Sequence, residues 1–390
     1  MRKILEGSHA VAEAVKLSRA QVISAYPITP QTHIVEGLAE MAANGEIQAE
    51  FVRVESEFSA ASVCLGAAAA GARAYSATTS QGLLLMLEVI FNIAGMRLPM
   101  VFTIANRAIS APLNIWNDHQ DSMTVRDSGW IQLWAEDCQE ALDMHIQAYR
   151  IAEDHRVYLP VLVNMDGFIL THTYEPVEIP SHEEVDAFLP PFNPLFKLDP
   201  KDPVTLGAFV GPEAYQEVRW SIDDALLGAK PVITEIAEEF RAKFGRFQGA
   251  LIDGYRLEGA ETVFVAMGSV LGTLKDTVDQ MRVEGIPAGV LKVRCFRPFP
   301  GDELYEALKG VKNVIVLEKA ISLGGGQILA GEMRSAFYGR SPAPRIVGAV
   351  AGLGGRDITP DTIRRVYQRT IESGEDFIWA DLKEQMIQEA

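Results

Sequence analysis

The first 170 residues alternate between short β-rich runs and helix-length segments, and this alternation restricts the fold more than any other feature. The β-rich runs span residues 22–25, 50–54, 72–77, 100–105 and 161–164. The helix-length segments between them span residues 29–43, 56–70, 82–95 and 137–154. Alternation of strands and helices predicts a parallel sheet that is covered by helices on both faces.

A proline-rich segment separates this half from a second, smaller α/β pattern. Residues 171–205 contain seven prolines, which predict an extended connector without regular elements. Helical spacing returns over residues 213–245, with a break predicted at Pro231. Further strands are predicted at residues 262–267, 288–294, 313–318 and 346–350, and helices at 271–284, at 302–309 and after the glycines 324–326. We therefore expect an α/β fold of two parallel-sheet domains, residues 1–245 with the connector 171–205, and residues 255–390.

The charge of the chain narrows the choice of partners. Lys and Arg total 35 and Asp and Glu total 52, so the formal net charge is −17. This field repels phosphate backbones and anionic lipids, so we expect neither nucleic acid nor a membrane surface as a partner. The longest apolar stretch, residues 82–95, contains Glu88 and Asn92 and is shorter than a membrane span. The start of the chain lacks the apolar core of a signal peptide, so a cytoplasmic protein is expected.

Cysteine and histidine usage predicts no metal centre in this chain. The three cysteines are far apart, without C-x-x-C, whereas an iron–sulfur cluster needs about four thiolates in clustered spacing. Buried free thiols are the expectation for Cys64, Cys138 and Cys295. The seven histidines are scattered, and neither a phosphate-binding G-x-x-x-x-G-K-[ST] loop nor H-E-x-x-H occurs.

Polar loops follow several of the predicted strands, where parallel sheets bind their ligands. Thr29 is bracketed by two prolines in the first of these loops, Tyr26-Pro27-Ile28-Thr29-Pro30. A stiff backbone at the mouth of a helix would suit a small anion. The same pattern is equally typical of a rigid helix N-cap, so both interpretations stay open.

Two charged residues occupy similar strand-end positions. Glu57 begins an alanine-rich helix, where a carboxylate is usually a partner of the helix dipole but could instead bind a heterocyclic cofactor. Arg107 follows the strand at 100–105 and could hold a carboxylate in a bidentate fork, or form an ordinary salt bridge.

In combination, these motifs resemble a known family. The first half carries, in order, Ala25-Tyr-Pro-Ile-Thr-Pro-Gln-Thr, Val54-Glu-Ser-Glu, Gln81-Gly, Ala105-Asn-Arg, Ile115-Trp-Asn-Asp and Gln120-Asp-Ser. The second half carries Met267-Gly-Ser, Arg297-Pro-Phe-Pro and Gly352-Leu-Gly-Gly-Arg-Asp. This order is similar to that in the α subunits of the 2-oxoacid:ferredoxin oxidoreductases, above all the multi-subunit pyruvate synthases, and it covers nearly the whole chain.

The resemblance implies a fold and specific roles. The first domain would be the pyrimidine-binding domain of thiamine-diphosphate enzymes, and the second would resemble the transketolase C-terminal domain. Glu57 matches the glutamate that bonds N1′ of the cofactor's aminopyrimidine, where it favours the tautomer that activates the thiazolium C2. Thr29 and Arg107 match the pair that holds the substrate carboxylate. Besides Glu57, the cofactor-binding residues expected in this chain are Tyr26, Pro27, Ile28 and Gln81.

The resemblance also implies that the active site is shared between chains. The family binds Mg²⁺ and the cofactor diphosphate through a Gly-Asp-Gly segment, which this chain lacks. Mg²⁺ and the [4Fe-4S] clusters are therefore expected in partner subunits of the β, γ and δ types, and ferredoxin, as an acidic carrier, should dock on such a partner.

The expected reaction converts a 2-oxoacid, coenzyme A and oxidised ferredoxin to acyl-CoA, carbon dioxide and reduced ferredoxin, in either direction. Pyruvate is the expected substrate, because Thr29 is neutral and a second carboxylate would need a second cation. A branched-chain 2-oxoacid, 2-oxoglutarate and oxalate remain alternatives. A non-catalytic scaffold subunit is the alternative of another class, although it would have no need of both Glu57 and Arg107.

Overall fold

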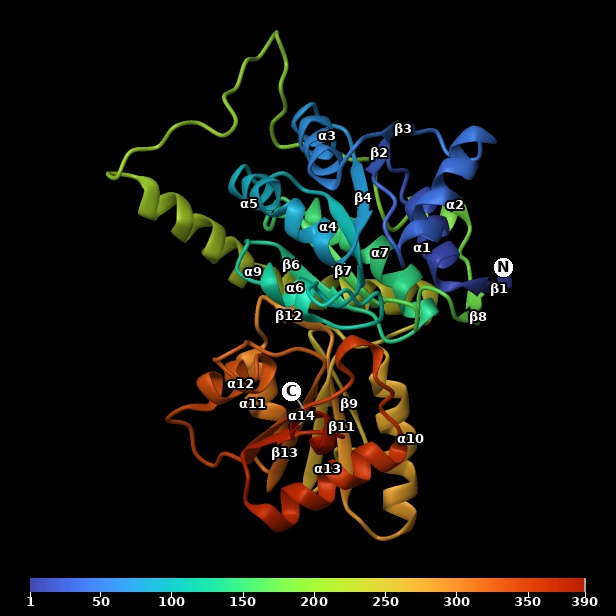
Figure 1. Ribbon diagram of the computed structural model, residues 1–390. Helices are drawn as coiled ribbons and strands as arrows, with labels where there is room; N and C mark the ends of the chain where they lie inside the picture. Colours follow the sequence, from blue (N-terminus) through green and yellow to red (C-terminus); the bar gives the residue numbers. More distant parts are fainter. Residues whose placement is uncertain (389–390) are drawn as a thin grey trace.

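The computed structural model describes residues 1–388, which form two α/β units, one above the other in Figure 1. The N-terminal unit is built on a seven-stranded sheet with the strand order β12-β6-β7-β5-β4-β2-β3. Every neighbouring pair in this sheet is parallel except β12 with β6. The bounds of its strands are Val22–Ala25 (β2), Glu50–Arg53 (β3), Ala74–Thr78 (β4), Val101–Asn106 (β5), Ile131–Trp134 (β6), Val161–Asp166 (β7) and Cys295–Arg297 (β12). The predicted parallel sheet is confirmed.

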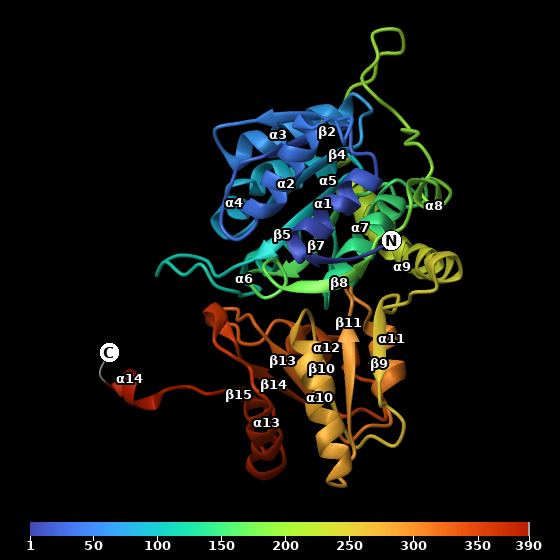
Figure 2. The same ribbon diagram turned by 90° about the vertical axis from the view of Figure 1, so that its right-hand side faces the viewer.

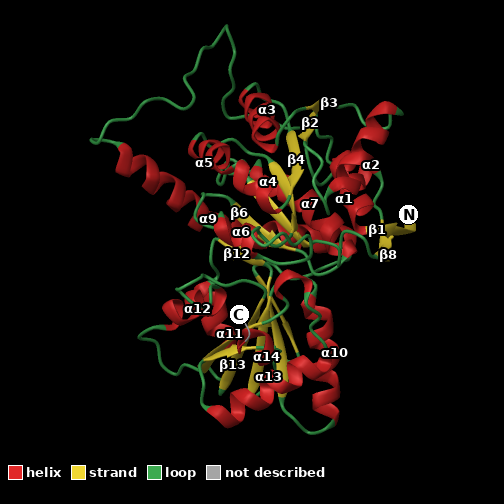
Figure 3. Ribbon diagram, in the orientation of Figure 1, coloured by secondary structure: helices red, strands yellow, loops and turns green. Residues whose placement is uncertain are grey.

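Helices cover both faces of this sheet, as Figure 3 shows. One face packs on α1 (Gly7–Leu17), α7 (Cys138–Ala152) and α9 (Tyr215–Phe244), whose buried side chains share one apolar core. The other face packs on α3 (Glu57–Ala69), α4 (Ser80–Leu85) and α5 (Leu87–Gly95), which share a second core. Helices α2 (Thr32–Ala43) and α6 (Gln120–Thr124) complete this part of the unit.

The second unit is a six-stranded sheet with the order β15-β14-β13-β10-β11-β9. Its strands are Ile252–Tyr255 (β9), Thr262–Ala266 (β10), Ala288–Val293 (β11), Asn313–Glu318 (β13), Arg345–Val350 (β14) and Phe377–Trp379 (β15). Only the edge strand β9 runs antiparallel to its neighbour. The helices are α10 (Val270–Val283), α11 (Gly301–Leu308), α12 (Leu329–Phe337), α13 (Pro360–Ser373) and α14 (Glu384–Gln388), and Figure 2 shows α14 lying away from the body of the unit.

Several boundary predictions were wrong. The segment 82–95 is two helices that meet at Met86, and α12 begins at Leu329, beyond the glycines 324–326. The strand at 346–350 is followed by α13 and β15, so it is not the last. No break occurs at Pro231, because α9 runs through it with Val232, Ile233 and Ile236 buried in the core.

The proline-rich segment is more regular than predicted. Residues Tyr174–Glu178 form β8, which pairs antiparallel with β1 (Arg2–Glu6), and His182–Asp186 form α8 with a capping box at Ser181. A two-stranded ribbon tolerates Pro176 because an edge strand leaves part of its donors unpaired. After α8 the chain first stays on the unit, with Phe188 and Leu189 in the core and the Leu198 N–H bonded to the Ala69 carbonyl, and the stretch before α9 then projects from the unit in Figure 1.

The two units are joined by a shared strand and by buried charges. Strand β12 belongs to the chain of the second unit but pairs with β6 in the first sheet. Beside it, Glu140 of α7 accepts hydrogen bonds from Lys292 Nζ at 2.6 Å and Arg294 Nε at 3.2 Å. These three side chains are almost completely buried, so removing one would leave an uncompensated charge in the interior. Among residues 1–388, no helix has the length and apolar character that crossing a membrane requires.

Candidate active site

Thr29 and Arg107 meet at the carboxyl edge of the seven-stranded sheet. Thr29 lies in the loop after β2, and Arg107 directly follows β5. Arg107 Nη1 donates to the backbone carbonyl of Thr29 at 2.9 Å, and Nε donates to the carbonyl of Asn114 at 3.2 Å. The arginine is only 6% exposed. Burial lowers its pKa, and the nearby Asp121 carboxylate opposes this effect.

Asp121 holds the ends of two strands in one arrangement. Its fully buried carboxylate accepts hydrogen bonds from the backbone N–H of Ser80 and of Arg107, both at 3.0 Å, and from Asn106 Nδ2 at 2.9 Å. Burial raises the pKa of Asp121, while these donors favour the charged form. The sequence interpretation gave Asp121 no role. Its place within the quoted Gln120-Asp-Ser motif was the available signal.

Glu57 lies over Gly82 and forms the second part of the site. Glu57 is the first residue of α3, is 7% exposed, and follows the N-cap Ser56, whose side chain accepts from the backbone N–H of Ser59. A Cβ atom added at Gly82 would come within 2.7 Å of Glu57 Oε1 and 2.5 Å of Thr78 Oγ1. The carboxylate therefore occupies space that only glycine leaves free.

Two residues next to Gly82, one in space and one in sequence, carry unpartnered polar atoms. Thr78 Oγ1 and Gln81 Nε2 are buried, and neither finds a hydrogen-bond partner within residues 1–388. A buried donor or acceptor without a partner costs free energy, so such atoms indicate a place where a polar ligand belongs. The residues present thus fit a heterocycle with ring nitrogens. The aminopyrimidine of thiamine diphosphate, the cofactor that the family resemblance implies, is such a ring.

The remaining predicted site residues lie in the loop after β2. Tyr26, Pro27 and Thr29 are exposed and Ile28 is half-buried. The buried Gln31 fixes this loop to the sheet, because its Nε2 donates to the carbonyls of Tyr26 at 2.8 Å and Ala77 at 3.2 Å. Within the described residues, no direct hydrogen bond joins this loop to Glu57. The link between the two parts runs through Ser80 and Asp121.

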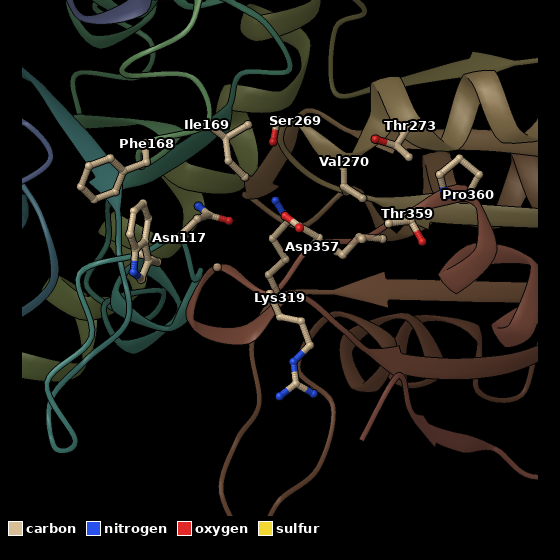
Figure 4. Close-up of a pocket in the computed structure, with 16 residues that line it drawn as sticks. Asn117, Phe168, Ile169, Ser269, Val270, Thr273, Lys319, Asp357, Thr359 and Pro360 are labelled. Atoms are coloured by element: carbon tan, nitrogen blue, oxygen red, sulfur yellow. The ribbon is translucent and has the colours of Figure 1, made fainter. Parts of the chain in front are cut away.

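A cavity of about 620 Å³ lies next to this edge, between the two units. Figure 4 shows Asn117 and Phe168 on one side and Ser269, Thr273 and Asp357 on the other. The cavity adjoins the loop after β2, since a Cβ on its lining residue Gly167 would lie 2.7 Å from Pro30 Cγ. None of the seven predicted site residues lines it.

Asp166 fixes the relation of the two units beside this cavity. It ends β7, and its carboxylate pairs with His119 Nε2 and Lys319 Nζ, both at 2.6 Å. Although burial acts to raise the pKa of Asp166, the charges of Lys319 and His119 prevail and hold it well below its usual range. Sequence analysis missed this carboxylate because it ended the strand two residues too early.

A comparison with protein families identifies the N-terminal unit. Residues 13–238 match the model described as pyruvate flavodoxin/ferredoxin oxidoreductase, thiamine diphosphate-binding. The chain belongs to this oxidoreductase family. Residues 260–363 match a second model of the same enzymes, pyruvate:ferredoxin oxidoreductase core domain II.

Individual oxidoreductases agree with this assignment. The chain is 52% identical to pyruvate synthase subunit PorA of Methanosarcina barkeri, over 98% of this chain and 97% of the relative. It is 42% identical to ketoisovalerate oxidoreductase subunit VorA of Pyrococcus horikoshii, over 98% of both chains. A solved 2-oxoglutarate:ferredoxin oxidoreductase from Magnetococcus marinus has the same fold, with a TM-score of 0.72 at 19% identity. That alignment covers 95% of this chain and 65% of the solved chain.

Proposed function

We propose that this chain is the α subunit of a pyruvate synthase, a thiamine-diphosphate enzyme that interconverts pyruvate and coenzyme A with acetyl-CoA and carbon dioxide, using ferredoxin as the electron carrier. The observation that carries the proposal is the match to PorA of Methanosarcina barkeri at 52% identity over almost the whole of both chains. The buried Glu57 and Arg107 at one sheet edge support a catalytic subunit over the scaffold alternative.

Glu57, Gln81 and the loop Tyr26–Ile28 would hold the cofactor's aminopyrimidine. When bound, thiamine diphosphate supplies the carbon nucleophile and the electron sink for decarboxylation. The carboxylate of Glu57 would hold a proton at N1′ of that ring, and Gly82 leaves the space in which the carboxylate lies. Gln81, the residue that precedes Gly82, would offer the donor Nε2, which is buried and has no hydrogen-bond partner among residues 1–388.

Arg107 and Thr29 would bind the substrate carboxylate. Two guanidinium nitrogens of Arg107 already donate to the carbonyls of Thr29 and Asn114, which leaves Nη2 for a ligand. A buried cation without a carboxylate partner is expensive, so an incoming carboxylate would gain a charge-assisted bond here. The exposed Thr29 hydroxyl would add a neutral hydrogen bond.

The rest of the enzyme would come from β-, γ- and δ-type subunits. Mg²⁺ and the cofactor diphosphate need hard oxygen ligands, and this chain has no Gly-Asp-Gly segment. The three cysteines are free and buried, as predicted, so the [4Fe-4S] clusters and the ferredoxin contact would lie on partners. Burial raises the pKa of Cys64 and Cys295 to about 12, which keeps both as thiols.

The substrate can be tested directly. The purified complex should be assayed with pyruvate, 2-oxoisovalerate, 2-oxoglutarate and oxalate, with coenzyme A and an artificial electron acceptor. We expect the highest kcat/KM with pyruvate and no turnover by the isolated chain. A preference for 2-oxoisovalerate would instead favour the branched-chain alternative, to which the VorA relative at 42% identity belongs. If the purified complex bound no thiamine diphosphate, the alternative that this chain is a non-catalytic scaffold subunit would be favoured.

A further inference from the structure

Two histidines and a glutamate that are distant in sequence meet on the side of the N-terminal unit where β1 and β8 pair. Glu6 ends β1, His33 lies in the first turn of α2, and His172 precedes β8. One ligand atom from each lies within 4.8 Å of the other two. The scattered spacing of the histidines predicted no metal cluster, but the pairing of β1 with β8 brings these three together.

The geometry of the cluster suits a metal ion. His33 Nδ1 is 2.6 Å from Glu6 Oε1, a contact in which the two atoms share one proton. The rings of His33 and His172 lie 4.6 Å apart between centroids. A bound cation would replace the shared proton and accept the lone pair of each histidine, since only deprotonated groups bind a metal.

Neighbouring groups orient the three candidate ligands. Thr171 Oγ1 is 2.7 Å from His172 Nδ1, and with Nδ1 donating to it the Nε2 lone pair is free to bind a metal. Tyr174 donates its hydroxyl to Glu6 Oε2 at 3.2 Å, which fixes the carboxylate from the other side.

Access and a further ligand are also present. Glu6 is almost completely buried, whereas the side chain of His33 is 42% exposed, so an ion can reach the cluster from solvent. His9 Nδ1 lies 3.6 Å from Glu6 Oε2 and offers a third imidazole on the same carboxylate. The remaining coordination position could be filled by this imidazole or by water.

We propose that Glu6, His33 and His172 bind a divalent transition metal ion of the zinc class. Two imidazoles and one carboxylate are the donors that Zn²⁺ and its neighbours prefer, whereas Mg²⁺ and Ca²⁺ take oxygen ligands. The ion would cross-link β1, α2 and the connection between β7 and β8. It would thus brace the α2 end of the loop that carries Thr29, without contacting substrate or cofactor.

The test uses the full-length chain, stripped of metal with a chelator, in competition with a chromophoric zinc indicator. We expect one tightly bound Zn²⁺ per chain and a zinc-dependent rise in Tm. His33→Gln and His172→Gln should each weaken binding by at least about tenfold, the loss that even an outer partner of a metal ligand causes. His182→Gln, at an exposed histidine in α8, is the matched control and should bind like wild type.

Two outcomes would overturn the site. One is the lack of saturable zinc uptake by the wild-type chain, which would make the cluster a His–carboxylate ion pair. The other is uptake that His33→Gln and His172→Gln leave unchanged. Far-UV circular dichroism checks that each variant folds. If a histidine variant does not fold, the visible spectrum of Co²⁺ bound to the wild-type chain decides. Tetrahedral, four-coordinate Co²⁺ absorbs intensely, Glu6→Gln should alter this spectrum, and a hydrated, octahedral ion on the surface absorbs only weakly.

Discussion

Arg107 Nη1 donates to the backbone carbonyl of Thr29 at 2.9 Å, although β4 lies between the strands that these two residues follow. The guanidinium therefore reaches across the end of β4 and fixes the loop after β2. The same side chain that we assign to the substrate carboxylate also sets the position of its neutral partner. Replacing Arg107 should therefore disturb both proposed partners of the substrate carboxylate, the guanidinium itself and the Thr29 hydroxyl. Replacing Thr29 should remove only the hydroxyl.

Replacing Glu57 by Gln should suppress activation of the cofactor while the complex stays folded. The amide is nearly isosteric with the carboxylate but cannot stabilise a proton at N1′. We expect exchange of the cofactor's C2 proton, followed by NMR on the assembled complex, to slow markedly, with little change in Tm. Exchange at the wild-type rate would mean that Glu57 serves only the dipole of α3.

Replacing Gly82 by Ala should disturb the same carboxylate through space alone. The new methyl group would meet Thr78 Oγ1 at 2.5 Å and Glu57 Oε1 at 2.7 Å, so both must move. We expect weaker thiamine diphosphate binding by calorimetry and slower C2 exchange. Gly272→Ala in α10 is the control, since no atom lies within 4 Å of its new methyl group. Equal binding by both variants would contradict the proposed position of the aminopyrimidine.

The local pattern of the sequence was sufficient for the sheet and for the positions of the candidate residues. Strands β2, β4 and β5 end where the alternation predicted, to within one residue, so Thr29 and Arg107 were correctly placed at strand ends. Each of these strands is buried on both faces, and a short apolar run followed by a polar loop is typical of such strands. Their roles in binding remain predictions.

Long-range contacts could not be predicted in this way. No strand was predicted at residues 295–297, but they add one to the sheet of the other unit. The pairing of Asp166 with Lys319 joins residues 153 positions apart. The Glu6, His33 and His172 cluster likewise depends on β1 pairing with β8. Such contacts arise from how elements pack, about which local periodicity carries no information.

Asp118 should make the stability of the protein depend on pH. It is buried in the loop between Arg107 and α6 and accepts from the backbone N–H of Gln120 at 2.7 Å. Burial raises its pKa to about 7 from an ordinary 3.8, and the nearby Asp121 adds to this. The folded state therefore binds the proton more tightly than the unfolded state does. Stability should fall as pH rises from about 4 to about 7, by at most about 1.4 kcal/mol per pH unit, and then level off.

The measurement is the Tm of wild type and of Asp118→Asn by calorimetry at intervals from pH 4 to pH 8. The amide does not titrate, so the difference in Tm should shift in favour of the variant up to about pH 7 and stay constant above it. Asp127→Asn, at an exposed carboxylate, is the control and should leave the wild-type slope unchanged. If the difference in Tm between wild type and Asp118→Asn did not change with pH, Asp118 would have the same pKa in the folded and the unfolded state.

Replacing Arg107 by Lys should lower kcat/KM for pyruvate more than replacing Thr29 by Ala. Lysine cannot reproduce the planar fork, and losing a hydrogen bond to a charged group costs on the order of 1.5–3 kcal/mol, or about ten- to more than a hundredfold. It also loses the bond to the Thr29 carbonyl, so Thr29 is held less firmly, while Gln31 still holds the cofactor-facing part of the loop at the Tyr26 carbonyl. Thr29→Ala removes one neutral donor and should cost less.

The control must separate substrate binding from a structural role, because Arg107 also bonds two backbone carbonyls. Arg97 also donates to two backbone carbonyls, those of Tyr158 at 3.0 Å and Val157 at 2.6 Å. It lies before β5, whereas Arg107 follows β5, so it is at the opposite edge of the sheet. Arg97→Lys should therefore lower Tm as much as Arg107→Lys does while leaving kcat/KM for pyruvate unchanged. Titrations of each complex with thiamine diphosphate should give near wild-type affinity, since the substrate carboxylate is not part of the cofactor. If Arg107→Lys kept full catalytic efficiency, or lost cofactor rather than pyruvate, a purely structural role for Arg107, in which it holds the carbonyls of Thr29 and Asn114, would be the better interpretation.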